Sequence, residues 1–248
     1  MYKKSRIFQS LAISFFLLSL CTSKNCFAAY QWGFGDMSFN HLSWDQGTQN
    51  KSTKRDFNYL ELEGGGQFSW GELYGFFDSE NPGKSNDEIR SATKGSIRYN
   101  ICNSNFSLYS HVYNFSSFGF SEQNRIYGFG YQILGKDWFF KPFLGAHEVS
   151  QTYFSGMNGF MAGWTLFWSF KISGESFTAI DWHEIEFERN LIYAASNGDS
   201  RTSHNGAASI WWNPRADISA GLQWRYAVNK LGTPGALNAL IESLKYNF

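Results

Sequence analysis

The chain has 248 residues, 21 Lys and Arg against 21 Asp and Glu, 19% aromatic residues, 24 glycines and only four prolines. This length suits one domain, and no clustered basic stretch suggests a nucleic-acid partner. After residue 28, no stretch is long and apolar enough for a transmembrane helix. Abundant aromatic residues and glycines are instead typical of a transmembrane β-barrel, whose strands are apolar on one face only.

The N-terminal residues predict a secretory signal peptide. Basic residues precede the apolar run from Leu11 to Leu20, and Cys26-Phe-Ala28 offers small residues for cleavage. The apolar run is too short to span a bilayer as a helix. We therefore predict two parts, a signal peptide over 1–28 and an outer-membrane barrel over 29–248.

The predicted mature chain is acidic and has no disulfide. Four of the 21 basic residues and none of the acidic ones precede residue 29, so the remainder is acidic by four charges. Two of the three cysteines also lie there, and Cys102 alone cannot form an internal disulfide. None of the five histidines shows a metal-ligand spacing, so we expect neither a metal nor a cofactor.

Alternating apolar and polar residues predict twelve antiparallel strands, with ten as the alternative. The clearest are Phe160 to Phe170 and Ile218 to Val228, each with one apolar face and one mostly small or polar face. Strands of about ten residues suit a bilayer, whereas soluble sheets favour about 5–6. The predicted strands lie near 32–44, 56–68, 72–79, 89–101, 106–115, 125–134, 138–149, 159–172, 177–188, 204–212, 218–228 and 239–248.

The connections between these strands are predicted to alternate in length. Outer-membrane barrels alternate short periplasmic turns with longer extracellular loops, and an even strand count puts both termini in the periplasm. This pattern predicts an all-β, transmembrane antiparallel barrel in the outer membrane of a Gram-negative bacterium, with periplasmic N- and C-termini. The predicted long connections are 45–55, 80–88, 116–124, 150–158, 189–203 and 229–238.

The last ten residues are typical of a closing barrel strand. Leu240, Leu244, Tyr246 and Phe248 share one face, which we expect to meet lipid and lipopolysaccharide. We predict that the barrel-assembly machinery recognises Tyr246 and Phe248. Glu242 lies on the same face, where a carboxylate is unfavourable.

Residues 56–78 are similar to the second and third strands of the Tsx/OmpK family of nucleoside-specific outer-membrane channels. The matching pieces are Tyr59-Leu-Glu61, Glu63, Trp70 and Tyr74-Gly-Phe-Phe-Asp78, with weaker similarity at 158–160, 177–182 and 246–248. The resemblance implies a twelve-stranded channel, and we expect it to work as a monomer. It also implies passive, selective uptake of nucleosides or similar small aromatic polar solutes.

With the polar faces turned inward, the predicted lumen is acidic on one side, basic on the next and rich in aromatic rings. Aromatic rings stack on bases, at roughly 1–3 kcal/mol per base, and charged groups form strong hydrogen bonds to hydroxyls. Alternatively, these charges pair with one another and plug the barrel, which would then be a surface receptor or a structural protein. The predicted solute-binding residues are Tyr59, Glu61, Glu63, Tyr74, Asp78, Arg98, Tyr127, Asp181, His183 and Arg225.

A third interpretation is enzymatic. His41 and Ser43 share a strand face, in a pattern similar to the paired His and Ser of outer-membrane phospholipases, and Asn58 could orient the histidine. A His-x-Ser triplet also arises by chance. We therefore predict that the protein is not an enzyme and has no catalytic residues.

Overall fold

The structure, a computed structural model, describes residues 29–102 and 104–248. The predicted signal peptide lies outside these residues. Neither helix in the described part of the chain is long and apolar enough to cross a membrane. The elements are β1 (Tyr30–Trp44), α2 (Gln46–Lys51), β2 (Phe57–Phe68), β3 (Gly71–Glu80), β4 (Arg90–Asn100), β5 (Phe106–Ser117), β6 (Phe120–Tyr131), β7 (Ile133–Leu134), β8 (Trp138–Gln151), β9 (Phe154–Ile172), β10 (Glu175–Phe187), α3 (Leu191–Ser196), β11 (Ser203–Arg215), β12 (Ile218–Lys230) and β13 (Thr233–Asn247).

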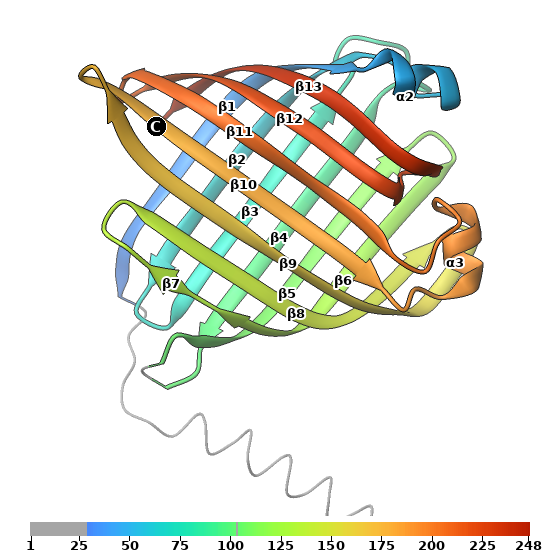
Figure 1. Cartoon of the computed structure of the whole chain (residues 1–248), viewed down its shortest axis with the longest axis horizontal. Helices are drawn as coiled ribbons and strands as arrows, with labels where there is room; N and C mark the ends of the chain where they lie inside the picture. Colours follow the sequence, from blue (N-terminus) through green and yellow to red (C-terminus); the bar gives the residue numbers. More distant parts are fainter. Residues whose placement is uncertain (1–28, 103) are drawn as a thin grey trace, which may run out of the picture.

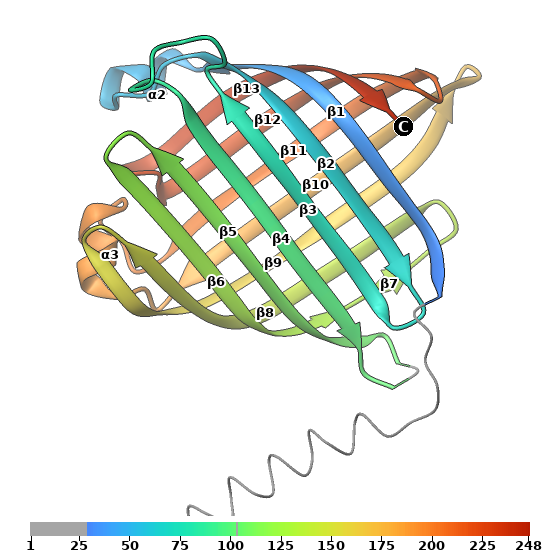
Figure 2. The ribbon, with the colours of Figure 1, turned by 180° about the vertical axis from the view of Figure 1, so that it is seen from behind.

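The strands form one closed antiparallel barrel (Figures 1 and 2). Each strand pairs with its neighbours in the chain, and β13 closes the barrel against β1 from Asp36↔Asn247 to Trp44↔Ala239. Both β6 and β7 pair with β8, so they form one wall strand interrupted at Gln132. The predicted count of twelve is therefore confirmed, and the alternative of ten is wrong.

The two ends of the barrel differ. Both helices lie at one end, and the described chain begins and ends at the other, where the connections are short (Figure 1). Of the six predicted long connections, three are long: those between β1 and β2, between β3 and β4, and between β10 and β11.

The other three predicted loops, 116–124, 150–158 and 229–238, are wrong, because the strands continue into two-residue turns. In the last of these turns, Leu231 (φ 60°) and Gly232 (φ 77°) both adopt the left-handed conformation that tight hairpins need. Small polar residues lie near all three turns, as in a loop. They interrupt the apolar alternation, although the backbone stays paired.

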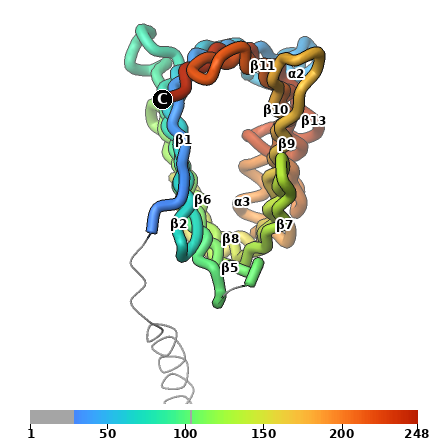
Figure 3. The backbone as a smooth tube through the Cα atoms, turned by 90° about the vertical axis from the view of Figure 1, so that its left-hand side faces the viewer, coloured from blue at the N-terminus to red at the C-terminus, as the bar shows by residue number. Residues whose placement is uncertain are grey.

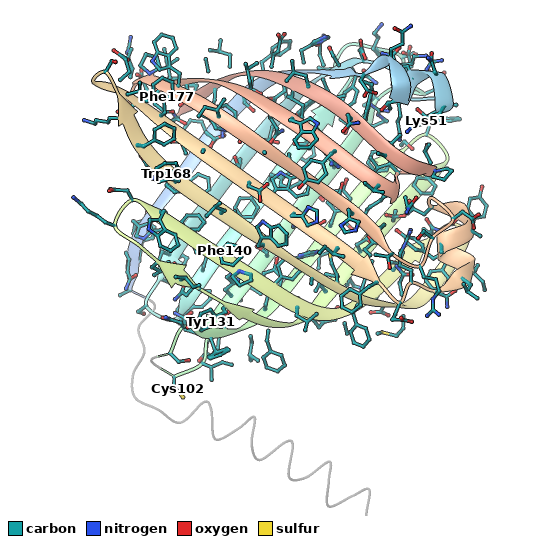
Figure 4. The ribbon with its side chains drawn as sticks, viewed as in Figure 1. Lys51, Cys102, Tyr131, Phe140, Trp168 and Phe177 are labelled. Atoms are coloured by element: carbon teal, nitrogen blue, oxygen red, sulfur yellow. The ribbon has the colours of Figure 1, made fainter. Side chains whose placement is uncertain are left out.

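The outer wall of the barrel is apolar. Residues opposite one another on paired strands share a face, and exposed pairs such as Phe39↔Leu60 and Leu62↔Phe77 recur around the barrel. Phe140, Trp168 and Phe177 lie on this wall toward the end that carries the short turns (Figure 4). An apolar wall of this kind suits hydrocarbon.

The barrel is flattened in cross-section (Figure 3). Consequently, long side chains from opposite walls can meet across the lumen, and several do.

Candidate functional site

The acidic side of the lumen is formed by β2 and β3, as predicted. Tyr59, Glu61 and Glu63 alternate with the outward Leu60 and Leu62, and therefore face the lumen.

On β3, Tyr74 and Asp78 also face inward, since the neighbouring Leu73 and Phe77 are exposed on the outer wall. The Tyr74 hydroxyl donates a hydrogen bond to Glu63 Oε1 at 2.6 Å. Asp78 lies directly opposite Glu61 in the strand pairing. An aromatic ring and several carboxylates are thus presented together to the lumen.

Lys245 of β13 partly neutralises this acidic wall. Its ammonium lies 3.2 Å from Asp36 Oδ2 and 3.1 Å from Glu63 Oε2. Asp36, Glu61 and Glu63 are the one group in the described chain with three possible metal-ligand atoms within 4.8 Å of one another. Sequence spacing gave no sign of this group because its members come from two strands. The Lys245 ammonium already supplies a positive charge there.

Arg225 faces the lumen from β12 and is held by several partners. It donates to the carbonyl oxygens of Gly206 (2.9 Å) and Tyr226 (2.5 Å), and also to Asn205 Oδ1. Its guanidinium lies 5.1 Å from the centre of the Trp182 ring. These contacts fix the Arg225 side chain and leave the Trp182 ring beside it.

Arg98 also faces inward, but it joins two walls. Its guanidinium donates to the carbonyl oxygens of Lys141 (3.0 Å) and Pro142 (3.2 Å) on β8. It lies 3.7 Å from Glu72 Oε1, and Lys141 pairs with the other oxygen of Glu72. The predicted solute contact is thus a buried link between β4 and β8.

Tyr127 was predicted to line the lumen, and this placement is wrong. It is 52% exposed and pairs with Ser110 and Ala146 on the outer wall. Its neighbour Ile126 is buried inside instead. Polar residues lie on both faces of β6, where the outward Arg125 pairs with Glu148 at 3.2 Å, so polarity could not identify the inner face.

Asp181 and His183 were also predicted to face the lumen, and the structure places both on the outer wall. Glu184 and Glu186 of the same strand point inward, and residues of a strand alternate between faces. Because β10 carries acids on both faces, the sequence pattern allowed the wrong choice.

On the outer wall, Asp181 and His183 belong to a polar cluster. Trp164 Nε1 donates to Asp181 Oδ2 at 2.6 Å, and the Trp164 ring stacks on His183 at 4.6 Å. The two ring nitrogens of His183 lie 2.7 Å from the Tyr226 hydroxyl and 3.2 Å from His204 Nδ1. These mutual contacts satisfy many of the hydrogen-bonding groups of the cluster within the wall.

Two inward tryptophans were missed by the sequence analysis. Trp182 lies between Asp181 and His183, so the wrong face of β10 concealed it. The Lys245 ammonium lies 4.5 Å from the centre of the Trp211 ring on β11. The sequence carried no clear signal for either ring, because acids lie on both faces of β10 and because Trp211 lies between two other apolar residues, the exposed Ile210 and Trp212.

Two buried clusters fill parts of the lumen. Inside β1, β2, β12 and β13, the residues that pack together are Leu42, Trp44, Tyr59, Ala227, Leu237, Ala239 and Ile241. Tyr59, a predicted solute contact, is therefore buried in this packing, at 8% exposed.

Tyr109, Ile126, Phe143 and Met161 form the second buried cluster, inside β5, β6, β8 and β9. Gly163 is required beside it, because a Cβ there would lie 2.7 Å from the Phe143 ring.

Helix α3 packs over the end of the side formed by β5, β6, β8 and β9. Tyr193 is fully buried, and its hydroxyl donates to Glu122 at 3.3 Å. Burial raises the pKa of the Tyr193 hydroxyl well above its usual value, which keeps it a hydrogen-bond donor.

The residues of the enzymatic alternative lie on the outer wall. His41 Nδ1 is 2.7 Å from Asn58 Oδ1, so the predicted orienting contact is present. Among the described residues, the Ser43 hydroxyl forms no hydrogen bond to His41, and a nucleophile would need one. Glu242 is exposed on the same wall opposite His41, so this carboxylate has polar neighbours there.

Comparison with known proteins places the chain among channels. Residues 36–248 match the family model described as "Nucleoside-specific channel-forming protein, Tsx". A KdgM porin solved in complex with disordered oligogalacturonate is similar, with 10% identity, a TM-score of 0.49, and coverage of 86% of this chain and 99% of that one. An outer membrane channel from Pseudomonas putida F1 shows 14% identity, a TM-score of 0.46, and coverage of 92% and 100%.

Proposed function

Because the chain belongs to the Tsx family of nucleoside-specific channel-forming proteins of the Gram-negative outer membrane, we propose that nucleosides or similar small aromatic polar solutes pass passively through its lumen. The observation that carries this proposal is the pairing of two unlike walls. Carboxylates and Tyr74 line one wall, and Trp182 and Trp211 with their cations line the other.

These walls suit the two halves of a nucleoside. An aromatic ring can stack on the flat apolar base, and carboxylates and amides can accept or donate hydrogen bonds at the sugar hydroxyls. Several such weak contacts in series favour entry without trapping the solute. We assign the solute contacts to Glu61, Glu63, Tyr74 and Asp78, and add the two tryptophans.

The channel also has a setting in the cell envelope. The chain works as a monomer after loss of residues 1–28, with the short turns and both termini in the periplasm and the helical end outside. Its outer wall contacts lipid and lipopolysaccharide. We expect no enzymatic activity, because within the described chain no hydrogen bond from His41 activates the Ser43 hydroxyl. A plugged barrel serving as a receptor or a structural protein is the competing function.

Planar-bilayer recording tests the proposed function. Nucleosides should block the ion current saturably at concentrations at which sugars have no effect. Tyr74→Ala should weaken this block because it removes a ring from the lumen, whereas Tyr74→Phe should retain most of it.

Tyr127→Ala is the matched control, because it removes the same ring from the outer wall and should leave the block unchanged. If nucleosides and sugars block alike, or if no current passes at any voltage, the plugged barrel becomes the better account.

A further inference from the structure

We propose that the ion pair between Lys94 and Glu184 divides the lumen and sets the width of the conducting path. This inference rests on the proposed function, in that solutes must pass through the lumen. The Lys94 ammonium lies 2.7 Å from Glu184 Oε1.

The pair crosses the lumen. Lys94 belongs to β4 and Glu184 to β10, and these strands are not neighbours in the barrel. Strands β5, β6, β8 and β9 separate them along one side of the wall, and six strands separate them along the other. A direct contact between their side chains must therefore span the interior, which the flattened cross-section permits (Figure 3).

Glu184 is held in place by further contacts. Its second oxygen, Oε2, accepts from Asn205 at 3.4 Å, and Asn205 Oδ1 accepts from Arg225. Arg225 in turn binds two backbone carbonyl oxygens. The pair thus continues on the β10 side into a chain of contacts that reaches β12, so it is a fixed partition.

The partition separates unlike compartments. Behind it, the buried cluster of Tyr109, Ile126, Phe143 and Met161 fills the side enclosed by β5 to β9. The side enclosed by β10 to β13 and β1 to β3 has a buried cluster of its own around Trp44 and Tyr59, toward the helical end. Elsewhere this side carries the partly exposed carboxylates and aromatic rings of the proposed contacts. The side chains of Lys94 and Glu184 are themselves 18% and 12% exposed, so they border the open side.

These contacts make Lys94 and Glu184 determinants of size and charge selectivity. While paired, they present little net charge to the solute and confine it to one side. If either partner is removed, the other remains as an uncompensated charge in the path, which should alter which ions pass.

Single-channel recording in planar bilayers, on the full mature chain, tests the proposal. The double variant Lys94→Ala/Glu184→Ala should raise the conductance and reduce the discrimination against sugars. The exchanged variant Lys94→Glu/Glu184→Lys should restore both values toward those of the unaltered protein. Lys94→Ala alone should shift the reversal potential toward cation selectivity, and Glu184→Ala alone toward anion selectivity.

Arg215→Ala/Asp217→Ala is the matched control. It removes an exposed pair at the turn between β11 and β12 and should leave conductance and reversal potential unchanged. Glu184→Gln keeps the shape of the side chain. Its reversal potential must shift toward anions even if the double alanine variant does not assemble.

The proposal is overturned if an assembled double variant conducts and selects like the unaltered protein, if the exchanged variant resembles the double alanine variant, or if Glu184→Gln leaves the reversal potential unmoved. The two proposals fail separately. Ion conductance tests the partition, whereas nucleoside block of the unaltered channel tests the solute.

Discussion

Replacing Glu186 with Gln should destabilise the barrel far more than the same replacement at Glu188, two residues further along the chain. Glu186 is 1% exposed, and its two oxygens face different cations. Oε1 pairs with Lys230, and Oε2 lies 2.9 Å from Arg189 Nε, in an ion pair that lacks hydrogen-bond alignment. Glu188 pairs with Arg201, but both side chains are more than half exposed.

The structure sets the expected magnitudes. Removing one partner of a buried ion pair costs about 3–5 kcal/mol, because the other charge stays buried without compensation. Glu186→Gln leaves the charges of Arg189 and Lys230 without their carboxylate. Arg189 still donates to three backbone carbonyls, and Lys230 is not completely buried. We therefore expect the free energy of unfolding to fall by an amount within that range. Glu188→Gln should cost about 0–1 kcal/mol, as for exposed pairs. Glutamine has nearly the shape of glutamate, so no cavity contributes.

Urea unfolding in lipid vesicles, followed by tryptophan fluorescence, measures both losses under the same conditions. The free energy of unfolding should fall by at least about 2 kcal/mol more for Glu186→Gln than for Glu188→Gln. Equal losses would show that water reaches the ion pairs of Glu186 with Lys230 and Arg189. They would refute the conclusion that these buried ion pairs stabilise the barrel.

Two further predictions concern the closing strand and the outer wall. Replacing Tyr246 and Phe248 with Ser should leave unassembled protein in the periplasm, because both rings lie exposed on the outer wall at the end of the closing strand. Cell fractionation and a heat-modifiability gel measure the amounts of unassembled and assembled protein. Normal barrel levels in that variant would contradict recognition of the terminal strand. In a lipid-hydrolysis assay in detergent micelles, both the unaltered protein and Ser43→Ala should hydrolyse lipid no faster than the background rate. If the unaltered protein hydrolyses lipid and Ser43→Ala does not, the protein is an enzyme.

The fold could be predicted from the sequence because the bilayer imposes a strict period of two. Strands with a wholly apolar face, such as β9 and β12, were placed on the correct faces by that alternation alone. The prediction failed where the apolar constraint ends. Near the turns after β5, β8 and β12, small polar residues interrupt the apolar alternation, although the backbone remains paired.

The candidate site was predictable only where the two faces of a strand differ in polarity. On β2 and β3, Leu60, Leu62, Leu73 and Phe77 mark the outer face, and the inward residues followed from it. On β6 and β10, polar residues lie on both faces, so Tyr127, Asp181 and His183 were misplaced.

Contacts across the lumen could not be predicted at all. The pairing of Lys94 with Glu184 depends on which walls of the closed barrel face each other. That arrangement is a property of the flattened cross-section and leaves no local pattern in the sequence.

The most direct test of the central claim is transport itself. Proteoliposomes that contain the purified protein should release a trapped radiolabelled nucleoside faster than a labelled hexose, even though the nucleoside is larger, and liposomes without protein should retain both. Release of the hexose as fast as the nucleoside, or release of neither, would contradict a nucleoside-selective channel.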